Sequence, residues 1–318
     1  MKSAKSVAVI GQGFVGGSLT TVLAERGLTA YVYDKAGKLA HGATPARITR
    51  MAGDCSAEDV RSVNELVQSC SRIDGFSHVY FVCVPTPMYE DGSCDTSIVE
   101  GALKELAVAG GVDRIAVIKS TVPPGSTERW NKQFEGTGLH VIHCPEFLTE
   151  ANALNDMRNQ SRIVLGGPRP WINDVKRIFQ STFPNVPIIK TSSTTSELVK
   201  YYTNIHLAVR VVLSCELAQI CNALDKSGLD VDVDKVVEYA KYDKRLGSTH
   251  MDTPGHDGIP GARGHCFPKD LNALIAVAKQ HDVKPIVMEA VWRKNLEVIP
   301  EEHRDWEKMA GRAVSKKQ

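Results

Sequence analysis

Three glycines near the N-terminus, Gly11, Gly13 and Gly16, constrain the fold of this chain more than any other feature. They follow the apolar run at 6–11 and precede a helical pattern over 14–26. In such a unit the first glycine permits a tight turn, the second lets a phosphate approach the backbone, and the third allows the helix to pack closely on the strand. The helix N-terminus also offers N–H groups and a positive dipole end to an anion. We therefore predict a phosphate-binding strand–turn–helix unit at the start of the chain.

Short apolar runs rich in Val and Ile recur through the first 190 residues, and helical stretches such as 97–109 and 170–181 separate some of them. Continuous apolar strands of this kind indicate a parallel sheet that helices cover on both faces. The predicted fold class is therefore α/β, a doubly wound parallel sheet of the Rossmann type, over residues 1–191. Besides 6–11, strands are expected at 29–34, 78–84, 114–120, 140–145 and 162–167.

Residues 192–300 predict an all-α domain built on one long helix. A Ser/Thr cluster suited to helix capping precedes about thirty residues without Gly or Pro, so a single helix is expected over 195–226. Its apolar character suits either the core of a monomer or contact with a second subunit. The stretch 245–265 is rich in Gly and Pro and predicts a long loop, of a kind that is usually functional or mobile. Residues 301–318 are charged and polar and predict a tail. Further helices are expected at 232–243, 268–281 and 285–298.

Composition excludes several classes of protein. The 318 residues carry 38 basic and 37 acidic side chains, a net charge of +1, without the basic excess typical of nucleic-acid-binding proteins. No apolar run approaches the ~20 residues of a membrane span, and glycines interrupt the N-terminal run too soon for an export signal. The eight cysteines form no CxxC pair and no metal-binding spacing. We therefore expect no metal site, and reduced thiols in a cytoplasmic protein.

An acidic residue follows the glycine motif at an informative distance. Asp34 ends the second predicted strand, 23 residues after Gly11, where a carboxylate binds the ribose hydroxyls of a dinucleotide. Lys35 follows it, but no arginine does, so the pattern favours NAD over NADP. Phe14 and Val15, inside the glycine motif, are expected to contact the same cofactor.

Five further segments occur in the order that one family shows. They are FVCVPTP (81–87), KSTVPPGS (119–126), PEFLTEANALND (145–156), SELVKYYTN (196–204) and GARGHCFPKD (261–270). With the glycine motif, they resemble the UDP-glucose/GDP-mannose dehydrogenase family over about residues 5–300. The resemblance implies oxidation of the C6 alcohol of a nucleotide sugar to a carboxylate with two NAD, through a thiohemiacetal and a thioester on a cysteine.

The resemblance assigns catalytic roles to individual residues. Cys266 matches the nucleophile, and a helix start with nearby cations favours the thiolate. Lys200 and Asn204 match an oxyanion-stabilising pair and share one helix face at a spacing of four; the alternative is a surface lysine paired with Glu197. Asp270 matches the acid that positions water, although it also suits the N-terminal end of a helix.

The remaining candidates line the sugar and the cofactor. Glu150 matches the proposed general base, a role that burial would suit, whereas Glu146 either contacts the sugar or only shapes its loop. Thr121 is expected to contact the nicotinamide and water, or else to be a turn hydroxyl. Arg245 resembles an arginine that reaches the substrate of a neighbouring subunit, which would require a homodimer through the 195–226 helix. Further sugar contacts are Phe147, Leu148 and Gly261, and further cofactor contacts are Val84, Pro85, Thr86 and Lys269.

The chain departs from the family pattern in two ways. The usual GFGGSC loop reads GARGHC, with Arg263 in place of a glycine and His265 in place of a serine, so the loop is expected to follow a different path. The matching motifs end near 291–295, without the nucleotide-gripping domain that follows in the family. A partner chain supplying that domain is one expectation. The alternatives to the leading function are a two-electron hydroxyacid dehydrogenase and a non-catalytic NAD-binding subunit.

Overall fold

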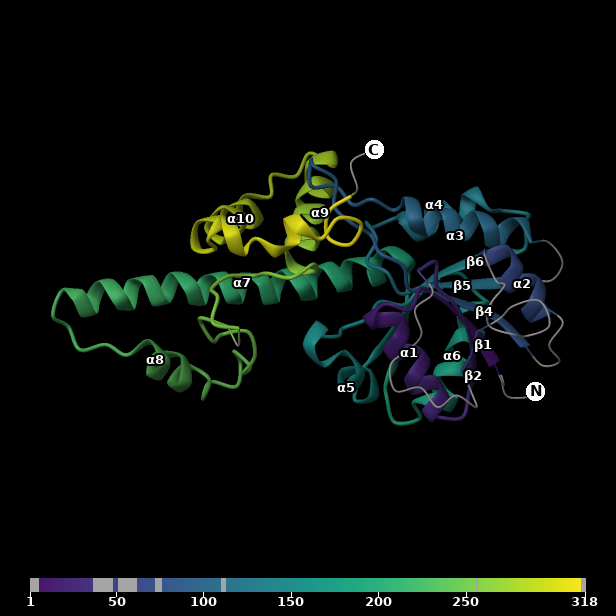
Figure 1. The fold of residues 1–318 in the computed structure, drawn as a ribbon, viewed down its shortest axis with the longest axis horizontal. Helices are drawn as coiled ribbons and strands as arrows, with labels where there is room; N and C mark the ends of the chain where they lie inside the picture. The colour runs from purple at the N-terminus through teal and green to yellow at the C-terminus, as the bar shows by residue number, and fades with distance from the viewer. Residues whose placement is uncertain are drawn as a thin grey trace. The chain divides into compact units, whose positions relative to one another are not determined.

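The computed structural model describes residues 6–36, 48–50, 62–71, 76–109, 113–255 and 257–315. It divides into two compact units. The first comprises Met1–Thr86 and Thr96–Lys200, and the second comprises Pro87–Asp95 and Tyr201–Gln318. Figure 1 shows a layered sheet with helices in the first unit, whereas the second unit is helical.

The first unit contains one eight-stranded sheet with the order β3-β2-β1-β4-β5-β6-β7-β8. Every neighbouring pair is parallel except β6 and β7, which meet in antiparallel fashion at His143 and Gly166. The predicted doubly wound α/β class is confirmed, and the order of the first six strands is that of the Rossmann fold. The strands are β1 Ser6–Ile10, β2 Thr29–Tyr33, β3 Ile48–Arg50, β4 Phe76–Val82, β5 Arg114–Ile118, β6 Leu139–His143, β7 Ile163–Gly166 and β8 Ile188–Thr191.

The alternation of side chains along each strand produces two separate cores. On β1, Val7 and Val9 belong to one cluster, while Ala8 and Ile10 belong to the other. Because successive strand residues point to opposite faces, apolar residues at every position require helices on both sides. One face packs on α1 Phe14–Glu25, α5 Ala153–Arg158 and α6 Ile172–Thr182, and the other on α2 Val63–Ser71, α3 Ser97–Val108 and α4 Ser126–Gln133.

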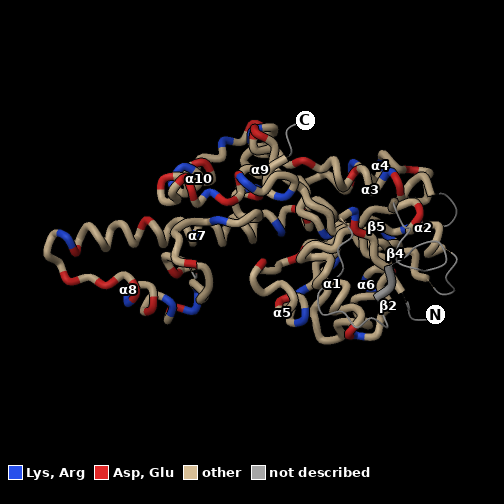
Figure 2. Tube along the Cα trace, viewed as in Figure 1, with Lys and Arg blue, Asp and Glu red and all other residues tan. Residues whose placement is uncertain are grey.

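The second unit is organised around α7, a single helix of 34 residues from Ser193 to Lys226 whose first turns belong to the first unit. The remaining helices are α8 Val233–Ala240, α9 Phe267–Gln280 and α10 Ile286–Val298, all at the predicted positions. In Figure 2, α7 carries few charged residues along its middle. Among the described residues it is the one helix long and apolar enough to cross a membrane, a test that core helices of soluble proteins also pass. Isolated polar residues interrupt the apolar runs of α7, so a search for unbroken apolar runs does not find its high average hydropathy.

The predicted polar tail over 301–318 is folded as far as the structure describes it. Two short 3₁₀ helices, Glu301–His303 and Asp305–Lys308, follow α10. Trp306 is 2% exposed, and its ring lies 5.8 Å from that of Trp292. The N–H of Ser315 donates to the carbonyl of Met88. The segment is polar on average, but a few of its apolar side chains suffice to pack it against the rest of the second unit.

Candidate active site

The three N-terminal glycines adopt the geometry that a dinucleotide loop needs. Gly11 has φ +88°, and a Cβ there would lie 2.6 Å from the carbonyl oxygen of Cys83. A Cβ on Gly16 would lie 1.9 Å from the carbonyl oxygen of Gly11, so neither position admits a side chain. Around Gly13, the N-cap of α1, no atom lies within 4 Å of a built Cβ, and no side chain caps the helix. The loop therefore leaves room and N–H donors for a pyrophosphate.

The carboxylate of Asp34 stands at the end of β2 beside this loop. Its two oxygens accept hydrogen bonds from the backbone N–H of Gln12, at 2.8 Å, and of Ala36, at 2.9 Å. Phe14 and Val15 occupy the first turn of α1 and are partly buried. Three glycines and a carboxylate fixed by backbone N–H groups fit the pyrophosphate and the ribose of NAD.

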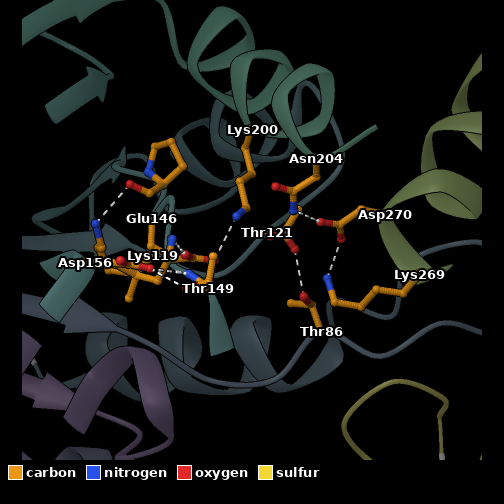
Figure 3. Close-up of polar contacts among 12 residues, drawn as sticks. Thr86, Lys119, Thr121, Glu146, Thr149, Asp156, Lys200, Asn204, Lys269 and Asp270 are labelled. Atoms are coloured by element: carbon orange, nitrogen blue, oxygen red, sulfur yellow. Dashed lines mark hydrogen bonds and ion pairs between the residues drawn. The ribbon is translucent and has the colours of Figure 1, made fainter. Parts of the chain in front are cut away.

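The segments after β4 and β5 are joined by two hydroxyl groups. The hydroxyl of Ser120 donates to the carbonyl of Val84 at 2.6 Å. The hydroxyl of Thr86 donates to the carbonyl of Thr121 at 2.8 Å, a bond drawn in Figure 3. Thr86 and Thr121 are buried, whereas Pro85 is exposed. These candidates therefore lie together at the carboxyl ends of neighbouring parallel strands, where ligands of such sheets bind.

The loop after β6 carries a buried ion pair. The ammonium of Lys200, on α7, donates to Glu146 at 2.8 Å, and the two side chains are 3% and 6% exposed (Figure 3). The second oxygen of Glu146 accepts the N–H of Leu148 at 2.6 Å. Phe147 lies beneath the ammonium, with 5.8 Å from its ring centroid to Nζ. Lys119 donates to the carbonyl of Pro145 at 3.1 Å. The loop is thus held by two buried lysines.

The environment of Glu150 differs from the expected one. Glu150 begins a 3₁₀ turn and is exposed. It therefore lacks the burial that we expected of a general base. The exposure follows from the neighbouring turn, in which Asp156 accepts the N–H and the hydroxyl of Thr149, at 2.8 and 2.6 Å, and keeps the segment at the surface.

Glu197 is a buried residue whose part in the site the sequence did not reveal. It does not pair with Lys200 as the surface alternative supposed. Its carboxylate accepts the N–H of Gly125 at 2.6 Å, and the N–H and hydroxyl of Thr127 at 2.8 and 2.6 Å. Burial, and the charge of Glu128 to a smaller extent, raise its pKa despite these bonds. Glu197 thus ties the second turn of α7 to the segment that follows Thr121. The only signal in the sequence was its place in SELVKYYTN.

The second unit holds another buried polar cluster. The amide of Asn204 donates to Asp270 at 2.6 Å, and the ammonium of Lys269 donates to the other oxygen of Asp270 at 2.5 Å (Figure 3). Burial opposes the charge of Lys269, but Asp270, Cys266 and Cys94 together raise its pKa. The cluster therefore keeps a cation beside a carboxylate at the start of α9.

Cys266 is the N-cap residue of α9 and is partly buried. Its carbonyl accepts the N–H of Asp270 at 2.9 Å, the first hydrogen bond of that helix. Seven cysteines lie within the described residues and are free thiols, whereas Cys55 lies outside them. Neighbouring His265 is 8% exposed, so it does not face solvent.

The loop before Cys266 accommodates its unusual arginine. The left-handed conformations fall on Gly261, at φ +93°, and Gly264, at φ +74°, and not on Arg263. The expected steric conflict at Arg263 therefore does not arise. Arg245, in contrast, is 88% exposed and pairs with Asp243 at 2.5 Å.

The candidates thus gather within each unit separately. In the first unit the structure brings together Thr86 with Thr121, and Glu146 with Lys200, while in the second it brings together Asn204, Lys269 and Asp270 next to Cys266. Lys200 and Asn204 occupy one face of α7, one turn apart. Glu150, in the first unit, and Arg245, in the second, are exposed.

Known proteins match the chain along most of its length. Residues 5–182 match the NAD binding domain of the UDP-glucose/GDP-mannose dehydrogenase family, and residues 194–297 match its central domain. UDP-glucose 6-dehydrogenase TuaD from Bacillus subtilis (strain 168) is 30% identical over 306 residues, which cover 92% of this chain and 63% of TuaD. UDP-N-acetyl-D-mannosamine dehydrogenase from Pyrococcus horikoshii is 28% identical over 285 residues, which cover 86% of this chain and 65% of that protein.

A solved structure agrees with these matches. UDP-glucose dehydrogenase from Pyrobaculum islandicum superposes with a TM-score of 0.75 at 27% identity, covering 92% of this chain and 68% of its own. The chain spans about half to two thirds of the length of curated relatives that it matches, with shares from 46% to 68%. The glycine loop and Asp34 fit the cofactor of the matching domain, and that cofactor is NAD. The chain belongs to the UDP-glucose/GDP-mannose dehydrogenase family of NAD-dependent dehydrogenases.

Proposed function

We propose that this chain oxidises the C6 alcohol of a nucleotide sugar to a carboxylate, with two NAD per sugar and Cys266 as the nucleophile. The observation that carries the proposal is the setting of Cys266, a partly buried thiol at the N-cap of α9. One turn later comes the buried carboxylate of Asp270, bonded to Asn204 and Lys269. A two-electron dehydrogenase has no use for such a nucleophile.

Lys200 and Asn204 stabilise the sugar oxygen in both oxidations. In each oxidation, bound NAD would accept a hydride from C6. An ammonium has three N–H donors, and among the described residues Lys200 gives one to Glu146, which leaves two for the oxygen. The Asn204 amide gives one N–H to Asp270 and has a second to offer. Donors aimed at a developing negative charge lower the barrier for its formation.

Cys266 makes the second oxidation possible. Its thiolate adds to the aldehyde carbon, a C–S bond forms, and the carbonyl electron pair moves onto the oxygen held by Lys200 and Asn204. Loss of the second hydride restores the carbonyl as a thioester. Water then adds, the C–S bond breaks, and the thiolate leaves with its electron pair. The sum consumes one alcohol, one water and two NAD⁺, and gives one carboxylate, two NADH and three protons.

The remaining candidates serve the water and the sugar. We assign to Asp270 the positioning of water, to Thr121 a contact with the nicotinamide and water, and to Glu150, an exposed carboxylate, the role of general base. Glu146 holds Lys200 at the sugar oxygen through the 2.8 Å ion pair. Further sugar contacts are assigned to Phe147, Leu148, Arg245 and Gly261. We place the protein in the cytoplasm, where NAD and nucleotide sugars are available.

The test is the yield of NADH per molecule of sugar, with limiting UDP-glucose and then UDP-N-acetylmannosamine and GDP-mannose. Two NADH per sugar are expected for one of them. Cys266→Ser should abolish acid formation, while Cys221→Ser, which alters a buried thiol on α7, should leave the yield at two. One NADH per sugar, unchanged in Cys266→Ser, would make the chain a two-electron dehydrogenase. If no sugar yields NADH, the chain would instead be a non-catalytic NAD-binding subunit.

We also propose that α7 joins two copies of the chain. Tyr202, Leu213 and Ile220 are 73%, 63% and 52% exposed, and spacings of 11 and 7 place them on one face at 3.6 residues per turn. Lys200 and Asn204 lie on the opposite face, about 180° away. An apolar stripe of this kind, left uncovered, is typical of a subunit contact.

Light scattering after size exclusion tests the contact. The unmodified chain should elute as a dimer, and Leu213→Glu with Ile220→Glu should give a monomer. Asn222→Glu adds the same charge to the opposite face of α7 and should leave the dimer intact. A monomer before substitution would refute the proposal.

A further inference from the structure

The loop that leads into Cys266 is bonded to the end of α10 and the segment after it. A Cβ on Gly261 would lie 2.3 Å from the side chain of Ile299, so the backbone there packs directly on that residue. The N–H of Ala262 donates to the amide oxygen of Asn295 at 2.8 Å, and the amide nitrogen of Asn295 donates back to the carbonyl of Ala262 at 3.0 Å. Asn295 is 1% exposed.

Arg263 continues the same set of contacts. Its guanidinium donates to the carbonyl of His303 at 3.0 Å, to Asp257 at 2.6 Å and to Asp305 at 3.1 Å. The other oxygen of Asp305 accepts the N–H of Gly264 at 3.3 Å. The Arg263 side chain is 15% exposed, so solvent screens these bonds only in part.

The arrangement suits the guanidinium of an arginine. Three separate acceptors surround one planar group with five N–H donors, whereas the ammonium of a lysine is a compact point charge. His303 and Asp305 also lie beyond residues 194–297, the part of the chain that matches the central domain of the family. The arginine that departs from the family pattern therefore bonds to a segment outside the family match.

We propose that Arg263 and Asp305 are a positioning pair that fixes the Cys266 loop for attack on the aldehyde. The inference rests on the proposed function of Cys266. Four successive residues, 261–264, contact the end of α10 and the segment after it, and Cys266 follows two positions later as the N-cap residue of α9. A nucleophile that is held on a rigid loop reacts faster than one that must search for its geometry. The pair should therefore matter for the second oxidation, which uses the thiol, and little for the first.

The test separates the two oxidations. Arg263→Lys and Asp305→Asn, singly and together, are compared with the unmodified enzyme by rapid mixing, in which the first and second NADH of one turnover are resolved. Each single variant should slow the second oxidation by about tenfold or more, with the first changed less than about twofold. The double variant should be no slower than the worse single variant, because both substitutions weaken the same contact between Arg263 and Asp305.

A second measurement does not require turnover. The rate at which iodoacetamide alkylates Cys266, followed by peptide mass spectrometry, should change about threefold or more in both variants as the loop loses its fixed position. The matched control is Glu289→Gln, which breaks an exposed pair with Lys279, 2.7 Å long, between α9 and α10. It should alter neither rate. Thermal unfolding corrects every rate for the folded fraction, and Asp305→Asn serves as the milder variant if Arg263→Lys does not fold.

The outcomes are distinct. Equal slowing of both oxidations, additive effects, or an alkylation rate equal to that of Glu289→Gln would overturn the positioning role. If Cys266→Ser still yields two NADH per sugar, the proposed function itself fails, whatever the loop variants do. If Cys266→Ser loses acid formation and the loop variants behave as the control, only the positioning role fails.

Discussion

Each unit of this protein buries a lysine against a carboxylate, and the two pairs are assembled in different ways. In the first unit Lys200 contacts Glu146 at 2.8 Å, across 54 positions of sequence. In the second unit Lys269 contacts its chain neighbour Asp270 at 2.5 Å, on the first turn of α9. One pair therefore depends on how a helix packs against a loop, and the other is nearly complete within a single helix turn.

The difference decides what remains when a lysine is lost. Glu146 keeps one hydrogen bond, from the N–H of Leu148. Asp270 keeps the amide of Asn204 at 2.6 Å and lies in the first turn of α9, at the positive end of that helix. A buried carboxylate that keeps a hydrogen bond beside a helix N-terminus suffers less from the loss of its cation than one that keeps a hydrogen bond alone.

The largest effect is expected for Lys200→Met. Glu146 would stay buried without its ion-pair partner, at a cost of about 3–5 kcal/mol in the free energy of unfolding. Turnover should fall by about 10²–10³ through loss of an oxyanion donor. Urea unfolding and steady-state NADH production measure the two effects. Lys190→Met, at an exposed lysine bonded to Asn173, is the control and should change neither. A fall in turnover below tenfold would contradict the assigned role.

A smaller loss of stability is expected for Lys269→Met. The Asn204 amide and the N-terminal end of α9 should limit the loss to about 1.5–3 kcal/mol. Urea unfolding under the conditions used for Lys200→Met gives the comparison directly. If Lys269→Met proves the more destabilising of the two, the Asn204 amide and the helix N-terminus do not compensate as proposed.

The pH dependence of stability tests the burial of charge in the first unit. His143 is fully buried, and burial together with the charges of Lys119 and Lys200 lowers its pKa from 6.5 to about 3. The unfolded chain binds a proton there near pH 6.5, whereas the folded protein does not until about pH 3. The free energy of unfolding should therefore fall as the pH drops from 6.5 toward 3, by up to about 1.4 kcal/mol per pH unit.

His143→Gln should flatten that slope, because glutamine retains a polar partner for the hydroxyl of Ser196, 2.9 Å from His143 Nδ1, and has no proton to gain. Urea unfolding between pH 4.5 and about 7.5 provides the measurement over the range in which histidine titrates in unfolded chains. An unchanged slope would show that other groups govern the acid sensitivity.

The smallest effect on stability is expected for Arg245→Ala. Arg245 is 88% exposed and pairs only with neighbouring Asp243, so the melting temperature should not change measurably. The KM for the nucleotide sugar should nevertheless rise by about tenfold if the arginine contacts substrate. An unchanged KM would remove Arg245 from the binding site while leaving both lysine pairs unaffected.

Much of the fold follows from patterns that are short in sequence. Short continuous apolar runs predicted six strands of the sheet, and a stretch without Gly or Pro predicted α7 from 195, two residues after its observed start at Ser193. Strands β3 and β8, of three and four residues, were not predicted, because so few residues carry little periodicity. The antiparallel meeting of β6 and β7 was also missed, since strand direction depends on the path of the chain between strands.

The sequence by itself determined the glycine loop, the family motifs and the candidate residues, because each of these depends on only a few neighbouring residues. Only the tertiary structure decided that Glu197 binds Gly125 and Thr127, 72 and 70 positions away, that Arg263 meets Asp305 across 42 positions, and that Glu150 is exposed. The physical reason is that burial and long-range hydrogen bonds arise from packing. A side chain carries its chemistry in its own structure, but the partners that fix its orientation come from whichever distant segments the folded chain brings against it.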